Sequence, residues 1–520
     1  MSENSRVVKA AGVVGAATLL SRILGFIRDA VIAWYFGAGF SSDAFIAAFR
    51  IPNLLRRLFA EGSLSSAFIP IFTDVIVNKG RREAFQMARS GFRLLCLILI
   101  FIAVGGILLA PLIVRFIAPG FETEKLSITV TLTRLMFPYI IFIGLTALCM
   151  GILNVLGNFA TPALAPALLN IAIIGSVLFI APSLSTPVLG LATGVLIGGM
   201  LQLALQLPAL IRKGFRIWGK SRWIHPALKR VGSLIPPVIL GGAVYQINIV
   251  AGTLLGSLLS EGSVTYLYFA DRLVQFPLGI FAIAAATAVL PSLSRQAAAR
   301  QIYDLRNTFA LSLRLVFFIS IPATVGLIVL REPIVALLFQ RGEFNAVATQ
   351  LTARALLYYS LGLWAFSAVK IVTAVFFALQ DTRTPVMIAV ISIVANIILG
   401  VALMKPFAHG GLALATSLAS VLNLVLLVRA LRIKLGSLGW KSIALSACQT
   451  LISSVAMGLI VWATSRVILP VEYGTLSEML MGVVASIAVG LCTFGFISHV
   501  VKSQELNYVL AEARKGIGKK

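Results

Sequence analysis

Long apolar runs dominate this chain from end to end, and short polar stretches separate them. Many of the runs approach twenty residues, the length that an α-helix needs to cross the hydrocarbon core of a membrane. None of the polar stretches is long enough to fold as a soluble domain. We therefore predict an all-α polytopic membrane protein with fourteen transmembrane helices, at residues 10–36, 42–77, 90–118, 127–153, 162–182, 188–210, 233–258, 264–293, 308–339, 347–378, 385–404, 411–431, 442–468 and 477–500.

The overall composition supports the same class of protein. Of the 520 residues, 59% are hydrophobic and only 12% are charged, and the mean hydropathy is +0.99. A soluble domain of this size would need a more charged surface. The four cysteines all lie in apolar segments, which favours small core residues over disulfides or metal ligands.

The net charge of +25 raises the question of a nucleic-acid partner. Most of the 43 basic residues, however, fall in loops on one side of the predicted membrane, including the loop at 212–230 and the lysine-rich C-terminal tail. Cytoplasmic loops of membrane proteins carry such an excess of lysine and arginine. We therefore predict that both termini are cytoplasmic and that the protein has no nucleic-acid partner.

The chain matches itself at an offset of about 222 positions, which is the pattern of an internal repeat. Each copy would hold six spans, an even number, so both copies would have the same orientation in the membrane. Low-complexity apolar runs align easily by chance, but several anchors at one offset do not. The matching stretches are 111–122 with 333–344, 156–162 with 379–385, and 190–210 with 411–431.

We expect the two copies to form two six-helix lobes, related by an axis along the membrane normal and sharing a cavity. The N-terminal lobe would comprise residues 1–222 and the C-terminal lobe residues 223–440. The last two spans, within 441–502, lie outside the repeat, and residues 503–520 would form a cytoplasmic tail. Parallel repeats of this kind are typical of transporters.

Charged residues interrupt the first two apolar segments. SRILGFIRDA (21–30) carries Arg22, Arg28 and Asp29, and FRIPNLLRRLFAEG (49–62) carries three more arginines and a glutamate. A basic side chain at the middle of a membrane costs ~2.5–3.5 kcal/mol on insertion scales. These residues must therefore face a hydrated cavity or protein partners rather than lipid.

Helical periodicity groups many of these polar residues on common faces. In the second segment, one narrow stripe holds four of them, whereas Arg56 points away from it unless Pro52 bends the helix. The stripe consists of Arg50, Asn53, Arg57 and Glu61, and the first segment adds two pairs spaced seven residues apart, Ser21 with Arg28 and Arg22 with Asp29.

The second copy of the repeat also carries charge inside apolar segments. YFADRLVQFP (268–277) contains Asp271 and Arg272, and the segment at 347–378 contains Lys370. Both copies would therefore contribute polar groups to a shared cavity.

Ion pairing within the protein is the simplest alternative explanation. It accounts for single residues, such as Arg57 with Glu61 four positions later. It fails for the group, because the in-span cations outnumber the in-span carboxylates, which are Asp29, Asp43, Glu61 and Asp271. An arginine-rich cavity favours an anion, and the planar guanidinium suits phosphate. We therefore predict a substrate that carries phosphate or pyrophosphate.

The sequence offers little for other chemistries. It has no P-loop, and it lacks the close pair of in-span aspartates that a Mg²⁺-dependent enzyme acting on polyprenyl phosphates would need. His225, His409 and His499 lie far apart, in or beside loops, and we expect them at the surface. We predict no catalytic residue, no metal site and no cofactor.

Four stretches resemble the signature of the MurJ (MviN) family, the bacterial lipid II flippases: SRILGFIRD, GAGFSSDAF, IPNLLRRLFAEGSLSSAFIP and YFADRLVQFPLGI. The resemblance extends through essentially the whole chain. The family belongs to the multidrug/oligosaccharidyl-lipid/polysaccharide exporter superfamily, with two six-helix lobes around a cationic cavity. Its two C-terminal helices form a groove for the lipid tail, so the resemblance implies such a groove within 441–502.

The resemblance also implies a substrate, a location and site residues. Lipid II (undecaprenyl-pyrophosphoryl-MurNAc-pentapeptide-GlcNAc) would move from the inner to the outer leaflet of the bacterial cytoplasmic (inner) membrane by alternating access, for peptidoglycan synthesis. Implied partners are membrane phospholipids, with other cell-wall synthesis proteins as candidates. Some members have a sodium site with a carboxylate in the seventh span, which 233–258 lacks. We expect substrate binding by Ser21, Arg22, Arg28, Asn53, Arg56, Arg57 and Arg272, and gating or ion pairing by Asp29, Asp43, Glu61 and Asp271.

Three alternatives stay open. A flippase for another polyprenyl-pyrophosphate oligosaccharide would share the architecture. A multidrug exporter would more often have twelve spans and few cavity arginines. A membrane glycosyltransferase or ligase using such a lipid would normally carry catalytic residues on a large outer loop, and the outer loops here are short.

Overall fold

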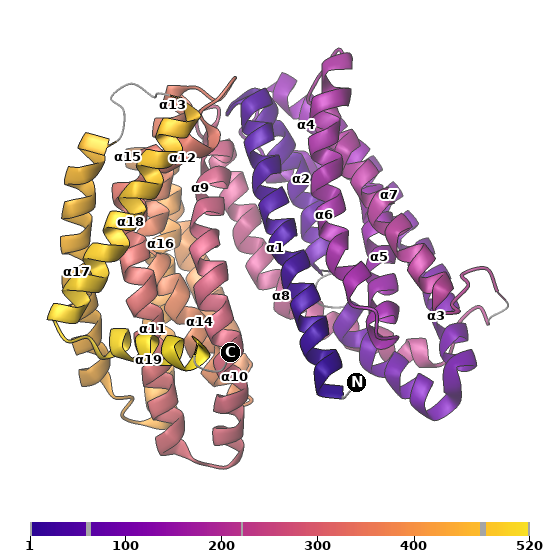
Figure 1. Ribbon diagram of the computed structural model, residues 1–520. Coiled ribbons are helices and arrows are strands. Elements are labelled where there is room, and N and C mark those ends of the chain that lie inside the picture. Colours follow the sequence, from indigo (N-terminus) through magenta and orange to yellow (C-terminus); the bar gives the residue numbers. More distant parts are fainter. Residues whose placement is uncertain (1–2, 59–63, 220–221, 469–474, 518–520) are drawn as a thin grey trace. The chain divides into compact units, whose positions relative to one another are not determined.

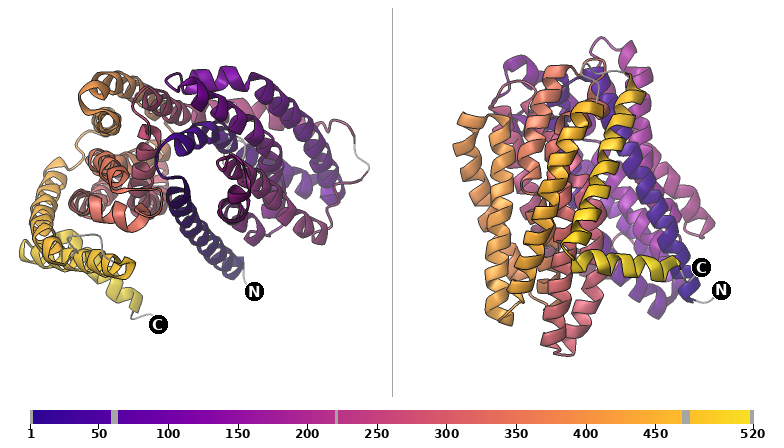
Figure 2. Two further views of the ribbon diagram at one scale, coloured as in Figure 1. Left: turned by 90° about the horizontal axis from the view of Figure 1, so that it is seen from above. Right: turned by 60° about the vertical axis from the view of Figure 1, so that its left-hand side comes forward.

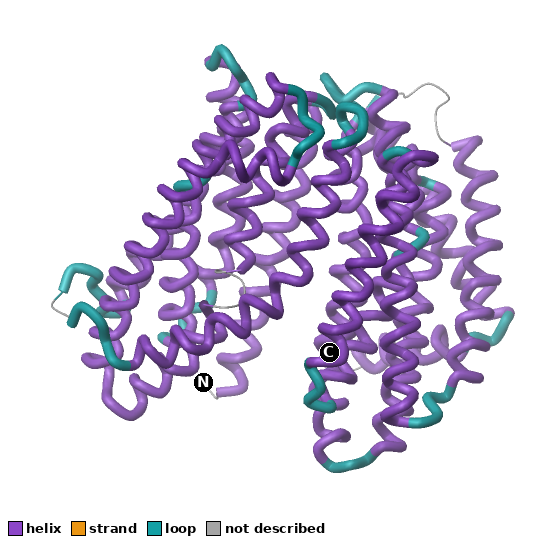
Figure 3. Tube along the Cα trace, turned by 180° about the vertical axis from the view of Figure 1, so that it is seen from behind, coloured by secondary structure: helices purple, strands orange, loops and turns teal. Residues whose placement is uncertain are grey.

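The computed structural model describes residues 3–58, 64–219, 222–468 and 475–517. Within these ranges the chain is helical, and no strand occurs (Figure 3). Ten helical runs in the described residues are long and apolar enough to cross a membrane, and the bent pair α13–α14 would make eleven. The prediction of an all-α polytopic membrane protein is confirmed, while the count of fourteen spans stays a prediction.

Two compact units divide the chain, residues 1–265 with 341–344, and residues 266–340 with 345–520. The helices of the first unit, labelled in Figure 1, are α1 (Glu3–Phe36), α2 (Phe40–Leu58), α3 (Leu64–Ile117), α4 (Thr123–Met136), α5 (Tyr139–Val155), α6 (Ala160–Gly175), α7 (Leu189–Arg212) and α8 (Ala227–Ser257).

The helices that follow belong to the second unit, apart from the first turn of α9. They are α9 (Ser263–Pro277), α10 (Ile283–Ala298), α11 (Ile302–Val329), α12 (Arg331–Phe339), α13 (Ala346–Ser360), α14 (Leu363–Ala378), α15 (Arg383–Phe407), α16 (His409–Leu435), α17 (Trp440–Ile468), α18 (Leu476–Val500) and α19 (Gln504–Ile517).

Helix boundaries recur along the chain at the offset of the sequence repeat. Shifting α7 by about 222 positions places it on α16, and the same shift places α2 on α9 and α4 on α13. The single helix α3 corresponds to three helices, α10 to α12. The repeat is therefore visible in the local structure as well as in the sequence.

The compact units and the predicted lobes divide the chain at different places. The predicted boundary lies at residue 222, where the repeat begins again, whereas the units meet at residue 265 because α8 packs against α3 and α2. A repeat boundary and a packing boundary are different quantities, so the predicted lobes stay a prediction.

Proline, glycine and polar caps set the local breaks. Pro138 separates α4 from α5, and Gly80 interrupts α3 with a φ of 82° that favours glycine. The predicted loop at 78–89 is otherwise helical, because α3 continues on both sides of this kink. The Asn345 side chain accepts a hydrogen bond from the Ala348 N–H at the start of α13.

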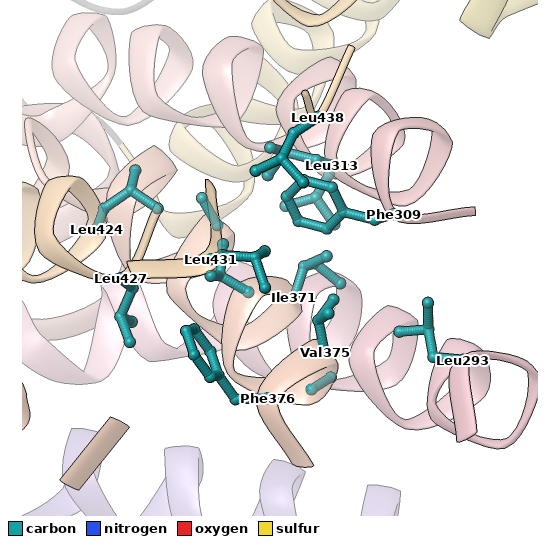
Figure 4. Packing of buried hydrophobic residues seen from close by; sticks show 14 of the residues in the cluster. Leu293, Phe309, Leu313, Ile371, Val375, Phe376, Leu424, Leu427, Leu431 and Leu438 are labelled. Carbon is teal, nitrogen blue, oxygen red and sulfur yellow. The ribbon is translucent and has the colours of Figure 1, made fainter. Parts of the chain in front are cut away.

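Apolar packing holds each unit together internally. In the second unit, one cluster joins α10, α11, α14 and α16, with Phe309, Ile371, Phe376 and Leu431 at most 1% exposed (Figure 4). Burying each such side chain contributes ~1.5–3 kcal/mol relative to exposing it. In the first unit, a corresponding cluster forms around α3, α5 and α8.

The C-terminal helices pack onto the second unit. Helix α17 contacts α11 and α18, and α19 runs crosswise to them (Figure 2). Glu505 of α19 is buried and pairs with Arg314 of α11, with 2.5 Å between Oε1 and Nε. Burial alone would raise the pKa of Glu505, but hydrogen bonds from its own backbone N–H, Arg314 and Ser503 outweigh it, and the pKa lies below its ordinary value. This pair ties the chain's C-terminal helix to α11.

Candidate functional site

Arg28 is the centre of a buried polar cluster between α1 and α6. Its guanidinium donates to Asp29 Oδ1, at 2.6 Å from Nη2 and 3.0 Å from Nε, and its Nη1 donates to Asn170 Oδ1 at 3.0 Å. Arg28 is 8% exposed and Asp29 is 2% exposed. The apolar helices therefore hold a guanidinium that is both charge-neutralised and hydrogen-bonded, as a buried cation requires.

Asn170 is a member of this cluster that the sequence reasoning missed. Its Nδ2 donates to the backbone carbonyl of Ser21 at 3.0 Å, so it bridges one turn of α1 to the Arg28 side chain. The only signal in the sequence was one amide inside the apolar segment 162–182. That signal does not identify its partner, which lies 142 residues away in the chain.

Arg22 and Ser21 have different surroundings from Arg28. Arg22 is exposed on α1, and no hydrogen bond or ion pair joins it to another residue in the described part of the chain. Ser21 is half-buried. The predicted site residues of α1 thus include one buried, paired arginine and one exposed arginine.

Helix α2 carries the polar stripe and contains Pro52. Arg56 folds back onto the stripe, because its Nε and Nη2 donate to Asn53 Oδ1 at 3.1 and 3.0 Å. Arg57 and Arg50 are half-buried. Glu61, the predicted partner of Arg57, lies outside the described residues, so that ion pair stays a prediction.

Asp43 joins three segments of the first unit. Its Oδ2 accepts hydrogen bonds from Lys125 Nζ at 2.8 Å and from the Gly262 N–H at 2.8 Å. Its Oδ1 accepts from the N–H and Oγ1 of Thr265 at 2.9 and 2.6 Å. The carboxylate therefore caps the N-terminus of α9, where a negative charge is favoured. Lys125 was not predicted as its partner.

A second contact mirrors this cap. The N–H of Phe40, the first residue of α2, donates to Glu261 Oε1 at 2.7 Å. Helices α2 and α9 are equivalent in the repeat. Asp43, in the first turn of α2, caps α9, and Glu261, just before α9, caps α2. This reciprocal pair fixes Asp43 as a structural group of the first unit.

Arg272 is the predicted site residue of the second unit. It is half-buried on α9, its Nη2 donates to the Tyr268 hydroxyl at 3.0 Å, and its guanidinium carbon lies 5.1 Å from the centre of the Tyr268 ring. Asp271 accepts a hydrogen bond from Gln275. A tyrosine ring that stacks on a guanidinium stabilises the cation, and the half-buried Arg272 keeps part of its surface exposed.

Lys370 and the histidines are the remaining polar residues that the sequence singled out. Lys370 is exposed on α14, inside the predicted tenth span, and its place in a shared cavity stays a prediction. The prediction that the histidines lie at the surface is wrong for His225 and His409, which are each 2% exposed. Their imidazoles are satisfied internally, since His225 Nε2 lies 2.9 Å from Glu83 Oε1 and His409 Nε2 lies 2.8 Å from the Leu351 carbonyl.

No three His, Cys, Asp or Glu side chains in the described ranges come together as metal ligands would. What the helices do present is guanidinium groups in apolar surroundings, buried at Arg28, half-buried at Arg56, Arg57 and Arg272, and exposed at Arg22. Such groups attract anions, and phosphate oxygens match the guanidinium fork.

Comparison with known proteins gives one consistent result. The family described as "Lipid II flippase MurJ" matches residues 32–484. A "Probable lipid II flippase MurJ" of Vibrio cholerae serotype O1 is 34% identical over 94% of this chain and 95% of its own. A "Lipid II flippase MurJ" of Burkholderia cenocepacia is 37% identical over 81% of this chain and 82% of its own.

Solved structures agree with the sequence relatives. A lipid II flippase MurJ in an inward closed conformation matches with a TM-score of 0.78 and 27% identity, over 94% of this chain and 99% of that chain. An inward-facing multidrug resistance MATE family transporter of the MOP superfamily matches with a TM-score of 0.68 at 16% identity, over 82% of this chain and 98% of that chain. The second match shows a shared fold alone, whereas the relatives and the family match establish that this chain is a multi-pass membrane transporter of the MurJ family.

Proposed function

We propose that this protein flips lipid II from the inner to the outer leaflet of the bacterial cytoplasmic membrane by alternating access, for peptidoglycan synthesis. The observation that carries the proposal is the set of arginines on apolar membrane helices of both units, in a chain of the MurJ family. The pyrophosphate of lipid II supplies the anion that such arginines bind.

The burial of each arginine determines the role that we propose for it. Arg22, Arg57 and Arg272, exposed or half-buried, bind the pyrophosphate directly, and Arg56 does so together with Asn53. Arg28 is buried and paired with Asp29, and it contacts the pyrophosphate only when the site closes. Ser21 and Asp271 contribute hydrogen bonds around these groups.

Translocation of labelled lipid II in proteoliposomes tests the proposal. The purified protein should move lipid II between leaflets and leave it chemically unchanged, whereas a glycosyltransferase or ligase would alter it. A drug exporter would move cationic dyes rather than lipid II. Absence of lipid II movement, with well-folded protein in the vesicles, would overturn the proposal.

We further propose fourteen spans with both termini cytoplasmic, because basic residues concentrate in the corresponding loops. Single cysteines at the exposed positions Arg216 and Leu510, in a cysteine-free background, should react with an impermeant thiol reagent only after the cells are opened. Labelling of either position in intact cells would refute this topology.

The energy source follows from the charge of the substrate. Lipid II carries about two negative charges, and outward movement of each is favoured by ~2.3 kcal/mol per 100 mV when the inside is negative. We propose that the membrane potential drives the cycle and that sodium is dispensable. Collapsing the potential with valinomycin and potassium, at fixed sodium and proton gradients, should stop flipping; undiminished flipping would exclude this mechanism.

A further inference from the structure

The segment between α7 and α8 presents tryptophan and arginine side chains to the outside of the first unit. Trp218 is 92% exposed and Trp223 is 72% exposed. Single exposed apolar residues are ordinary, but two largely uncovered indoles on one short segment are a substantial apolar area. We call six exposed residues the loop platform, beginning with the last residue of α7: Arg212, Arg216, Trp218, Arg222, Trp223 and Ile224.

Buried residues anchor the loop platform at both ends. Phe215 is fully buried and packs edge-on against Phe85 of α3, with ring centres 5.4 Å apart. His225 is buried at the other end, where its Nε2 lies 2.9 Å from Glu83 Oε1. The exposed tryptophans therefore lie between two loop residues that are each held by α3.

Helix α3 also holds the backbone of the loop platform. Arg89 Nε donates to the carbonyl of Arg216 at 2.8 Å. Ser90 Oγ and Arg93 Nη2 both donate to the carbonyl of Arg222, at 2.6 and 3.1 Å. These bonds use the loop's carbonyls and leave the Arg216 and Arg222 side chains exposed. The platform is thus preorganised, with its indoles and guanidiniums directed outward.

The position of the loop platform in the chain places it at the level of the membrane headgroups. It follows α7, which is long and apolar enough to span a membrane, so it lies where that helix leaves the hydrocarbon. Tryptophan concentrates at the headgroup level of membranes, and exposed arginine there attracts acidic headgroups. The guanidinium of Arg93, 5.6 Å from the Trp223 ring, adds a further positive charge beside the indole.

We propose that the loop platform is a binding surface for acidic phospholipid. The indoles of Trp218 and Trp223 lie among the headgroups, and Arg216 and Arg222 bind their phosphates. None of the platform residues is assigned to substrate, so this inference does not depend on the proposed function.

Brominated lipids test the proposal, because bromine quenches the fluorescence of a nearby tryptophan. The intact protein is placed in nanodiscs containing brominated phosphatidylglycerol or, at the same mole fraction, brominated phosphatidylcholine. The protein has six tryptophans, so the signal of the platform is the difference between wild type and the Trp218→Phe/Trp223→Phe variant. Brominated phosphatidylglycerol should quench this difference signal more strongly.

Charge removal then identifies the residues responsible. Each arginine near the surface contributes about fivefold to acidic-lipid binding, so Arg216→Gln/Arg222→Gln should abolish the preference for phosphatidylglycerol. Arg295→Gln/Arg300→Gln removes the same charge from another exposed turn and should retain the preference.

Three outcomes would overturn the proposal. The first is equal quenching of the wild-type difference signal by the two lipids. The second is loss of the preference in the control variant to the same extent as in Arg216→Gln/Arg222→Gln. The third is stronger quenching that appears only when lipid II is added to nanodiscs of the same total lipid charge. The platform would then belong to the transport site.

Discussion

Arg28 and Arg272 each lie next to an aspartate inside an apolar segment of the sequence. Their burial and their partners in the two units nevertheless differ. Arg28 donates to its neighbour Asp29 and to Asn170, and is 8% exposed. Arg272 is half-buried and stacks on Tyr268 of its own helix. The first arginine is part of the packing of its unit, whereas the second keeps part of its surface available.

This difference separates two uses of arginine within a membrane. A buried ion pair must satisfy both charges internally, because removal of one partner leaves the other uncompensated. A half-buried guanidinium on an aromatic face is stabilised by the ring and can still exchange a ligand. Substitutions at the two positions should therefore differ in how they divide between folding and transport.

The largest effect is expected for Arg28→Ala. It leaves the buried Asp29 carboxylate without its cation, which should lower the free energy of unfolding by ~3–5 kcal/mol. The double variant Arg28→Ala/Asp29→Ala removes both charges and should recover much of that stability. Thermal unfolding in detergent measures both. If Arg28→Ala is as stable as the double variant, the Arg28–Asp29 ion pair does not have this structural role.

Arg272→Ala should have its effect on transport. Losing a charge-assisted hydrogen bond to phosphate removes ~1.5–3 kcal/mol, or about 10- to 150-fold in substrate binding. The protein should still reach the membrane, and its unfolding temperature should change little. Arg272→Lys should recover little, because lysine keeps the charge and lacks the planar fork. Complementation of a flippase-depleted strain, with membrane levels measured in parallel, checks this; full complementation by both variants would contradict the role.

The contrast also shows what the sequence could predict. Apolar periodicity located the helices, and the repeat predicted that their boundaries recur, because both depend on neighbouring residues. Partners such as Asn170 for Arg28 and Lys125 for Asp43 depend on which helices pack together. Seven-residue spacing suggested Ser21 as the neighbour of Arg28, but the structure inserts Asn170 between the Ser21 carbonyl and that guanidinium.

The charges of the first two segments illustrate the same limit. Their presence predicted a polar site, and the residues predicted for it lie on α1 and α2, apart from Glu61, which is outside the described residues. Which of them are structural could not be read from spacing, since Asp43 becomes a cap only when α9 begins beside it. A cap that joins residues 222 positions apart has no local signature.

Asn170→Ala sharpens the comparison within the first unit. Losing this amide leaves one guanidinium N–H of Arg28 without its acceptor, which should cost ~1–3 kcal/mol of stability. In the Arg28→Ala background the same substitution should cost much less, because the interaction is already absent. A double-mutant cycle measured by thermal unfolding gives this coupling. Additive effects would mean that Asn170 acts on α1 through Ser21 alone.

The smallest effect is expected for Tyr268→Phe in the second unit. It removes the hydroxyl that accepts from Arg272 and keeps the ring beneath the guanidinium. A single hydrogen bond contributes ~0.5–1.5 kcal/mol, so the lipid II concentration that half-saturates transport should rise at most about tenfold. The maximal transport rate and the unfolding temperature should stay close to those of the wild type. Tyr268→Leu removes the ring as well and should weaken transport further, because the cation loses its aromatic face. Titration of lipid II in proteoliposomes measures both variants. Equal defects in the two would assign the effect to the hydroxyl, and a fall in unfolding temperature for Tyr268→Phe would place Arg272 in the same structural class as Arg28.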